Sequence, residues 1–340
     1  MKNKKWISLA AAVILAVTAL PMTAFAAEKG GGEEKLTKVT LNEVAHSIFY
    51  APQYVAIEEG YFAEEGLDLT LVTGFGADKV LTALISGEAD IGFMGAEASI
   101  YAYQEGATDP AVNFAQLTQR AGNFLVAREE MSDFKWEDLK GKKVLGGRKG
   151  GMPEMVFEYI LKKNGIDPQK DLTIDQSIDF GSTAAAFTGD DSAAYTVEFE
   201  PSATILEKEG AGYVVASLGE ASGYVPYTSY SAKESYMKEN PEIIQKFTNA
   251  LQKGMDYVQS HTPEEIAEVI APQFKETDLD TITTIVKRYY DQDTWKENLI
   301  FEKDSFELLQ DILEDAGELN TRAEYEKLVQ TEYAQKACES

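Results

Sequence analysis

Five short turns of the sequence combine small residues with side chains that could contact a small molecule. They are residues 45–50 (AHSIFY), 73–78 (TGFGAD), 92–97 (GFMGAE), 146–153 (GGRKGGMP) and 180–183 (FGST). Glycine lets the backbone approach a guest closely, and free N–H groups at the start of a following helix can hold an anion or a carbonyl group. The first four of these turns each follow a predicted strand and lead into a predicted helix. We therefore predict a ligand cleft beyond the carboxyl ends of the strands.

The turn GGRKGGMP carries the strongest signal of the five. Arg148 and Lys149 place positive charge in an acidic chain, and Pro153 marks the first turn of a helix. In one interpretation, backbone N–H groups of Gly150, Gly151 and Met152, with or without Arg148, hold a polar or anionic group of a ligand. In the other, the segment is a solvated basic loop.

Aromatic residues are frequent in and beside these turns. Flat side chains there can enclose a planar ring, or they can pack in the core, which we expect for Phe49 and Phe93. We expect His46 to donate or accept a hydrogen bond in the pocket and not to bind metal, because the chain has one other histidine and one cysteine, Cys338. The other aromatic candidates are Tyr50, Phe75, Tyr195 and Tyr224.

Two carboxylates, Glu198 and Glu200, occupy alternate positions of the segment YTVEFEPSA and so share one face of a predicted strand. They could act as catalytic acid and base, bind amino groups of a ligand, or cap the helix that Pro201 begins. The sequence contains no Walker loop, nucleophile elbow, zinc-protease motif or dinucleotide fingerprint. It therefore favours a protein that binds a molecule without transforming it and without a cofactor.

Apolar periodicity predicts alternating strands and helices, which is typical of a mostly parallel sheet with crossover helices. The predicted strands are 39–44, 67–72, 89–93, 123–128, 143–147, 172–174, 193–197 and 213–216. The predicted helices are 52–60, 77–87, 96–104, 153–164 and 201–209, and the chain from 240 onward is helical. We predict an α/β fold of two lobes joined by two crossings, with lobe 1 at 39–127 and 223–340 and lobe 2 at 128–222.

The N-terminal segment predicts the compartment. MKNKK gives a basic start, an apolar stretch follows, and Ala24–Ala26 form an A-x-A cleavage pattern. We predict a signal peptide at 1–26, a linker at 27–38 and an exported protein, in the periplasm or at the extracellular surface, without a lipid-anchoring cysteine. The formal charge of −26 disfavours nucleic acid and anionic membrane surfaces as partners.

Four segments together resemble a known family. GYFAEEGLDLTLV, LTALISGEADIGFMGAEA, DLKGKKVLGGRKGGMPE and EFEPSA are similar to the solute-binding proteins of ABC importers, and within these to the SsuA/THI5-like (NMT1) family. The resemblance implies a periplasmic-binding-protein fold of type II that closes on a ligand like a hinged trap. It also implies a monomer that delivers its ligand to an ABC permease and its ATPase.

The family's ligand-lining turns fall on Ser47, Phe75, Gly76, Ala77, Gly95, Ala96, Glu97, Gly150, Gly151, Met152, Ser182 and Glu200. Relatives take alkanesulfonates, taurine, nitrate, bicarbonate, thiamine-precursor pyrimidines or riboflavin-like compounds. The aromatic residues in the turns, together with Glu198 and Glu200, favour a planar nitrogen heterocycle, such as a thiamine-precursor pyrimidine, over a sulfonate or nitrate as the ligand.

The sequence is also compatible with two other functions, a synthase and a receptor. The eukaryotic branch of the fold makes the thiamine pyrimidine, consuming pyridoxal phosphate and one of its own histidines, and it carries a cysteine-rich iron motif that this chain lacks. The second is an exported receptor that presents its ligand to a sensor instead of a permease.

Overall fold

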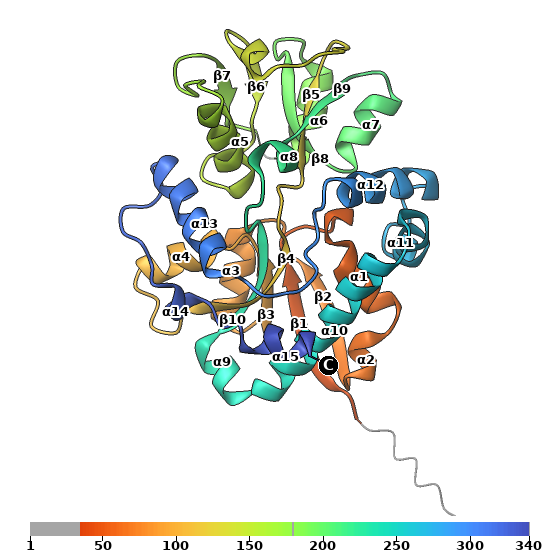
Figure 1. Cartoon of the computed structure of the whole chain (residues 1–340), viewed down its shortest axis with the longest axis vertical. Coiled ribbons are helices and arrows are strands. Elements are labelled where there is room, and N and C mark those ends of the chain that lie inside the picture. Colours follow the sequence, from red (N-terminus) through yellow and green to blue (C-terminus); the bar gives the residue numbers. More distant parts are fainter. Residues whose placement is uncertain (1–34, 179, 340) are drawn as a thin grey trace, which may run out of the picture. The chain divides into compact units, whose positions relative to one another are not determined.

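The structure is a computed structural model that describes residues 35–178 and 180–339 (Figure 1). The predicted signal peptide and most of the predicted linker lie outside the described residues. Within the described residues, every helix is too short or too polar to span a bilayer.

In the part of the chain that the structure describes, ten strands form two separate sheets of five (Figure 1). The first sheet has the order β2-β1-β3-β10-β4 and contains β1 (Thr37–Glu43), β2 (Leu67–Thr73), β3 (Ile91–Met94), β4 (Ala111–Thr118) and β10 (Thr228–Lys233). The second has the order β7-β6-β8-β5-β9 and contains β5 (Asn123–Ala127), β6 (Lys143–Leu145), β7 (Thr173–Asp175), β8 (Tyr195–Phe199) and β9 (Tyr213–Ser217).

One strand in each sheet runs against the others. β10 is antiparallel to β3 and β4, and β5 is antiparallel to β8 and β9, whereas β1 pairs in parallel with β2 and β3 and β6 with β7 and β8. The two reversed strands are those that the chain enters directly after it passes from one sheet to the other. Four strands per sheet therefore share a direction, and the prediction of two mostly parallel α/β lobes is confirmed.

This reversal places the carboxyl edges of the two sheets opposite each other. β4 ends at Thr118, and β5 begins at Asn123 beside Phe199, the last residue of β8. Five Cα–Cα steps reach about 17 Å, so the edges lie close together. The return crossing, 218–227, brings Thr228 back beside Thr118.

The structure moves the first crossing to 119–122, because residues 123–127 form β5 of the second sheet and were expected in lobe 1. The sequence interpretation also missed β4 and β10. All eight residues of β4 are buried, so its polar and apolar side chains do not alternate. Inside it, Asn113 is satisfied by hydrogen bonds from the hydroxyls of Ser229 and Ser231.

Helices follow most of the strands. Those of the first sheet's N-terminal part are α1 (Ala51–Glu58), α2 (Tyr61–Glu64), α3 (Ala77–Ser86) and α4 (Glu97–Gln104). Those of the second sheet are α5 (Met152–Lys163), α6 (Thr183–Gly189), α7 (Ser202–Lys208) and α8 (Leu218–Ser222). The C-terminal third forms α9 (Glu234–Glu239), α10 (Pro241–Ser260), α11 (Pro263–Ile270), α12 (Leu279–Asp291), α13 (Lys303–Asp315), α14 (Tyr325–Leu328) and α15 (Glu332–Cys338). Short 3-10 turns lie at Ile48–Tyr50, Trp136–Leu139, Phe180–Ser182 and Ala271–Gln273.

The long helix α10 anchors the C-terminal third on the first sheet. Its apolar residues recur at helical spacing, and the ring of Phe247 lies 6.0 Å from Phe114 and 5.5 Å from Tyr230. A Cβ at Gly254 would lie 2.3 Å from the carbonyl oxygen of Pro52, so glycine permits the close approach of α10 to α1. The same helix thereby holds in place the segment 46–51 at the carboxyl edge.

Candidate ligand-binding site

Two of the predicted turns, one from each sheet, lie next to each other. The guanidinium of Arg148 is 3.8 Å from the carboxylate of Asp78, and the hydroxyl of Tyr101 donates to the carbonyl of Gly150 at 3.5 Å. The Arg148–Asp78 pair is solvent-exposed on both sides, which places it at the rim. The segments 73–78 and 146–153 therefore meet where the carboxyl edges of the two sheets approach each other.

Glu97 is buried below this rim. Its side chain is 5% exposed and folds over Gly95, where a Cβ would lie 2.1 Å from Oε2. Burial raises the pKa of the Glu97 carboxyl to about 7, although hydrogen bonds from its own N–H and from that of Met152 lower it. Oε2 has no hydrogen-bond partner. A carboxyl from the first sheet thus faces the N-terminus of α5, and one of its oxygens is unsatisfied.

Two further buried side chains near the crossings lack partners. Asn123 is fully buried, and neither its Nδ2 nor its Oδ1 makes a hydrogen bond; Tyr227 is 3% exposed, and its hydroxyl is also unpaired. Burial raises the pKa of Tyr227, and the nearby Tyr50 and Glu97 add to the rise. The sequence interpretation missed both residues. Asn123 opens a predicted strand, and Tyr227 is one of 17 tyrosines, so no local pattern distinguished them.

Aromatic rings surround these groups. The ring of Tyr50 lies 4.5 Å from that of Phe93 and 5.2 Å from that of Phe49, and the ring of Phe49 lies 5.7 Å from that of Tyr227. Phe49 and Phe93 are fully buried, as expected of core residues. Burial raises the pKa of Tyr50 above that of an exposed tyrosine, and the charges of Glu43 and Glu97 raise it further.

Several predicted residues provide backbone at the starts of helices. The hydroxyl of Ser47 accepts a hydrogen bond from the N–H of Phe49 at the start of the turn Ile48–Tyr50. Gly76 precedes α3 with φ 147°, a conformation that favours glycine, and Ala77 is the first residue of α3. The remaining members of this group are Ala96 before α4, Gly151 before α5, Met152 at its first position, and the exposed Ser182 before α6.

Glu198 and Glu200 do not form a pair. Glu198 accepts hydrogen bonds from the hydroxyls of Thr183 (3.0 Å) and Thr196 (2.6 Å), and burial raises its pKa to about 7. Glu200 caps α7 by accepting from the N–H and the hydroxyl of Thr204, both at 2.9 Å, and it pairs with Arg288 at 2.7 Å. The capping alternative therefore describes Glu200, and its oxygens are occupied within the protein.

Three other candidates are not part of the buried group formed by Glu97, Asn123 and Tyr227. Tyr195 begins β8, at the opposite end of that strand from Glu200, and its hydroxyl contacts the sulfur of Met131. Phe75 is 75% exposed with φ 57°, and Tyr224 is exposed with its hydroxyl bonded to Asp293. We therefore leave all three out of the site that we propose below.

His46 belongs to a hydrogen-bond network around a residue that the sequence interpretation did not select. Glu43 is fully buried and accepts hydrogen bonds from Gln53, Tyr54 and Thr73, and from Nδ1 of His46 at 2.8 Å. The Glu43 contact raises the pKa of His46, whose Nε2 is bonded to the carbonyl of Gln273. Both ring nitrogens are thus used to hold the segment 43–46 in place. Within the described residues, no cluster of three acidic, histidine or cysteine side chains could hold a metal ion.

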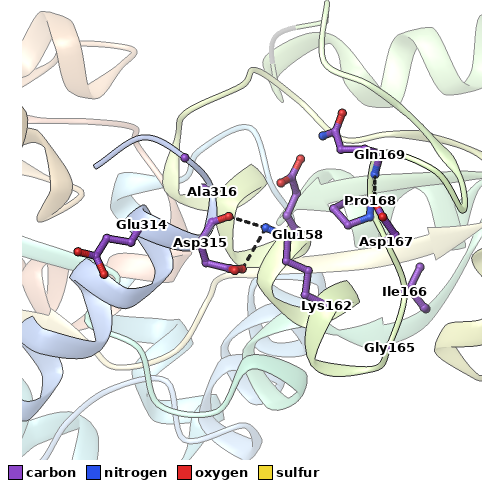
Figure 2. A pocket seen from close by; sticks show the side chains of 11 residues that line it. Glu158, Lys162, Gly165, Ile166, Asp167, Pro168, Gln169, Glu314, Asp315 and Ala316 are labelled. Atoms are coloured by element: carbon purple, nitrogen blue, oxygen red, sulfur yellow. Dashed lines mark hydrogen bonds and ion pairs between the residues drawn. The ribbon is translucent and has the colours of Figure 1, made fainter. Parts of the chain in front are cut away.

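A surface cavity of about 560 Å³ lies elsewhere, at the C-terminal end of α5 (Figure 2). Figure 2 shows Lys162 on one side of it bonded to Asp315 at the end of α13, with Glu158 and Asp167 nearby. Four acidic residues and one lysine line this cavity: Glu158, Asp167, Glu314, Asp315 and Lys162. None of the predicted site residues lines it, and those that precede or begin α5, Gly150, Gly151 and Met152, lie at the other end of that helix.

Comparison with known proteins places the chain in a family. The profile of the NMT1/THI5 like family matches residues 48–266. The protein YtlA of Bacillus subtilis (strain 168), whose name describes it as a candidate binding protein, is 48% identical over 304 residues, covering 89% of this chain and 91% of YtlA. The 4-amino-5-hydroxymethyl-2-methylpyrimidine phosphate synthase THI11 of Saccharomyces cerevisiae is 24% identical over 225 residues, covering 62% of this chain and 63% of the synthase.

Solved structures share the fold. The alkanesulfonate-binding protein SsuA from Xanthomonas axonopodis pv. citri, bound to MOPS, superimposes with a TM-score of 0.69 at 15% identity, covering 87% of this chain and 99% of SsuA. The family profile and the YtlA match cover more than half of the sequence, and the SsuA match supports the two-lobe architecture. The chain therefore belongs to the NMT1/THI5-like family and has the fold of the periplasmic binding proteins.

Proposed function

We propose that this protein captures a small organic solute between its two lobes and delivers it to the permease of an ABC importer. Family membership, the relation to YtlA and the periplasmic-binding-protein fold support this role. The predicted signal peptide would export the chain to the side of the membrane where an importer collects its substrate. Residues of both lobes would contact the solute, so its binding would favour the closed form.

The solute that we propose is a planar, nitrogen-bearing heterocycle such as a thiamine-precursor pyrimidine. The observation that carries this proposal is Glu97, whose buried carboxyl faces the N–H of Met152 at the start of α5. A helix N-terminus otherwise attracts anions. Because the pKa of Glu97 is about 7, the carboxyl is partly ionised at neutral pH, and this form would repel a sulfonate or nitrate by about 4 kcal/mol at 4 Å. An amino group or ring N–H would instead donate to the unsatisfied Oε2.

The aromatic residues fit the same class of solute. Tyr50 and Tyr227 are buried near Glu97, and each contacts the ring of Phe49. A flat heterocycle between aromatic faces gains about 0.5–1.5 kcal/mol per ring pair beyond the burial of its area. Hydrogen bonds at its edge would then fix its orientation.

Binding without chemistry agrees better with the residues of this chain than synthesis does. The synthase branch of the family is expected to use a cysteine-rich iron motif, and the one cysteine of this sequence, Cys338, lies in α15. His46, the histidine nearest the site, has both ring nitrogens in hydrogen bonds to Glu43 and Gln273.

A thermal-shift comparison tests the proposal. A ligand that binds the folded state raises the melting temperature through linkage. We expect 4-amino-5-hydroxymethyl-2-methylpyrimidine to raise it, and ethanesulfonate and nitrate at equal concentration to leave it unchanged. Riboflavin, a larger heterocycle, completes the panel. A shift with the anions alone would contradict the proposed class of solute.

Glu97→Gln provides the matching variant. The amide removes the charge and one acceptor, so we expect the shift caused by the pyrimidine to shrink by at least half. Glu105→Gln, at the exposed end of the same helix α4, is the control and should respond like the wild type. Equal shifts in all three proteins would remove Glu97 from the site.

A further inference from the structure

Three buried side chains near the facing edges carry polar atoms without hydrogen-bond partners: Glu97, Asn123 and Tyr227. Nearly all buried polar groups in folded proteins are paired, and an unpaired one costs free energy. In Asn123, neither the Nδ2 donor nor the Oδ1 acceptor has a hydrogen-bond partner. Such a group requires an explanation in terms of a partner that the isolated chain does not supply.

The other unpaired atoms of the described residues differ from Asn123. Gln116, Arg120 and Gln245 each keep another polar atom bonded, to Thr118, Gly219 and Tyr333 respectively. Asn42 has one such atom, its Oδ1, which lies against Gly74. Among the described residues, Asn123 is set apart because both of its amide atoms are buried and unpaired.

Asn123 and Tyr227 both lie near Phe49. Asn123 pairs with Phe199 across β5 and β8, and residues paired in this way project to the same face of a sheet. The ring of Phe199 lies 6.4 Å from the ring of Phe49. The ring of Tyr227 meets the same Phe49 ring edge-on at 5.7 Å. The charge of Glu97 acts on Tyr227 and on Tyr50, so the third unpaired group also lies close by.

The two residues also flank the two crossings between the sheets. Asn123 is the first residue of β5, directly after 119–122, and Tyr227 is the last residue before β10. A ligand bound to both residues would lie beside both segments that connect the two sheets.

We propose that Asn123 and Tyr227 bind the solute directly, and that the solute presents to Asn123 a ring edge with a hydrogen-bond donor beside an acceptor. This inference rests on the proposed function and narrows its class of ligand. An asparagine amide pairs in two-point fashion with such an edge, as it does with the N6 and N7 positions of adenine. Aminopyrimidines and cyclic amides have this edge, whereas sulfonates and nitrate have acceptors alone. The Tyr227 hydroxyl can donate to or accept from a neighbouring substituent.

Calorimetric titration of four proteins tests the inference: the wild type, Asn123→Leu, Tyr227→Phe and the control Tyr230→Phe. Tyr230 is equally buried, three residues further along, and its hydroxyl donates to Gln53 at 2.9 Å. The probes are 4-amino-5-hydroxymethyl-2-methylpyrimidine and its analogue with a methyl group in place of the amino group. We expect the first two variants to bind the amino compound at least about tenfold more weakly, and the wild type to lose about the same factor for the methyl analogue.

The melting temperatures of the ligand-free proteins separate a binding role from a structural one. The unpaired polar atoms of Asn123 and Tyr227 make no hydrogen bond within the protein, so Asn123→Leu and Tyr227→Phe remove none and should melt at or above the wild type. Tyr230→Phe breaks a made hydrogen bond and should melt lower while binding the amino compound like the wild type. Variants of Asn123 and Tyr227 that both melt below the wild type, or that bind the probe with unchanged affinity, would overturn the inference.

Failure of the proposed function gives a different result. If the wild type binds neither the amino compound nor any other member of the solute panel, the proposed function fails, and the ligand-free melting temperatures alone decide the inference. If the wild type binds ethanesulfonate or nitrate and not the amino compound, the donor-beside-acceptor class is overturned.

Discussion

The guanidinium of Arg288 in α12 donates to Oε1 of Glu200, 88 residues earlier in the chain, at 2.7 Å. The same guanidinium contacts Thr204 and the carboxylate of Glu207 in α7. Because Glu200 follows β8 of the second sheet, this contact links the C-terminal third to the second lobe independently of the two crossings. Of the alternatives that the sequence left open for Glu200, the contacts with Thr204 and Arg288 support the structural one, the cap of α7.

Arg288→Ala should destabilise the protein by roughly 3–5 kcal/mol, because it leaves the buried Glu200 carboxylate without its charge partner. Urea denaturation followed by circular dichroism measures this change as a lower midpoint. Lys287→Ala is the control: its pair with Asp291 is exposed and should contribute less than about 1 kcal/mol. Equal losses of stability in Arg288→Ala and Lys287→Ala would show that the buried Arg288–Glu200 pair contributes no more than an exposed pair.

Glu198 should make stability depend on pH. Burial raises its pKa from 4.5 to about 7 in the folded protein, so between these values the folded chain holds a proton that the unfolded chain has released. Stability contributed by this group is therefore present at low pH and is lost as pH rises through that window. Glu198→Gln removes the dependence.

The test compares free energies of unfolding at pH 5 and pH 8. Relative to the wild type, Glu198→Gln should gain on the order of 2 kcal/mol between the two values. The raised pKa values of Glu97 and Glu154 also make the wild type less stable as pH rises. The test therefore compares the pH dependence of the variant with that of the wild type, which itself depends on pH. Glu209→Gln, exposed at the end of α7, should run parallel to the wild type. A parallel curve for Glu198→Gln would contradict the prediction.

Gly151→Val should weaken ligand binding without unfolding the protein. Gly151 has φ −93° and ψ 154°, which valine adopts readily, and a Cβ there meets only ordinary contacts at 3.6 and 3.8 Å. The larger side chain stands before the N–H groups of α5, so we expect the dissociation constant for 4-amino-5-hydroxymethyl-2-methylpyrimidine to rise at least about tenfold. Gly189→Val, where the Cβ meets open space, is the control and should keep wild-type affinity. Undiminished affinity in Gly151→Val would exclude this turn from the site.

The sequence predicted elements whose signals are local. β1, β2 and β3 were recognised within two residues of their bounds, because each ends at a turn rich in small residues. The stripe Ile244, Phe247, Leu251 and Met255 marked α10. β4 was missed because burial on both faces removes the alternation on which strand recognition depends. β10 keeps a short alternation, Ser229, Tyr230, Ser231 and Ala232, which was not recognised as a strand.

Side-chain roles that depend on long-range contacts could not be predicted in this way. Glu200 was selected for its carboxylate, but its partner Arg288 lies in a helix that the sequence alone could not place beside it. Tyr195 was selected for its ring, but its position at the start of β8 turns it away from the carboxyl edge. Asn123 and Tyr227 stand out through the absence of partners, which is visible only in the packed structure.

Enclosure of a solute between the two lobes is the central claim. With the lobes apart, water can hydrate Asn123, Tyr227 and Glu97, so we expect the ligand-free protein to populate open forms that the solute closes. Small-angle X-ray scattering with and without saturating 4-amino-5-hydroxymethyl-2-methylpyrimidine measures this directly. The account predicts a smaller radius of gyration with the compound. An unchanged radius at a concentration where calorimetry shows full occupancy would contradict it.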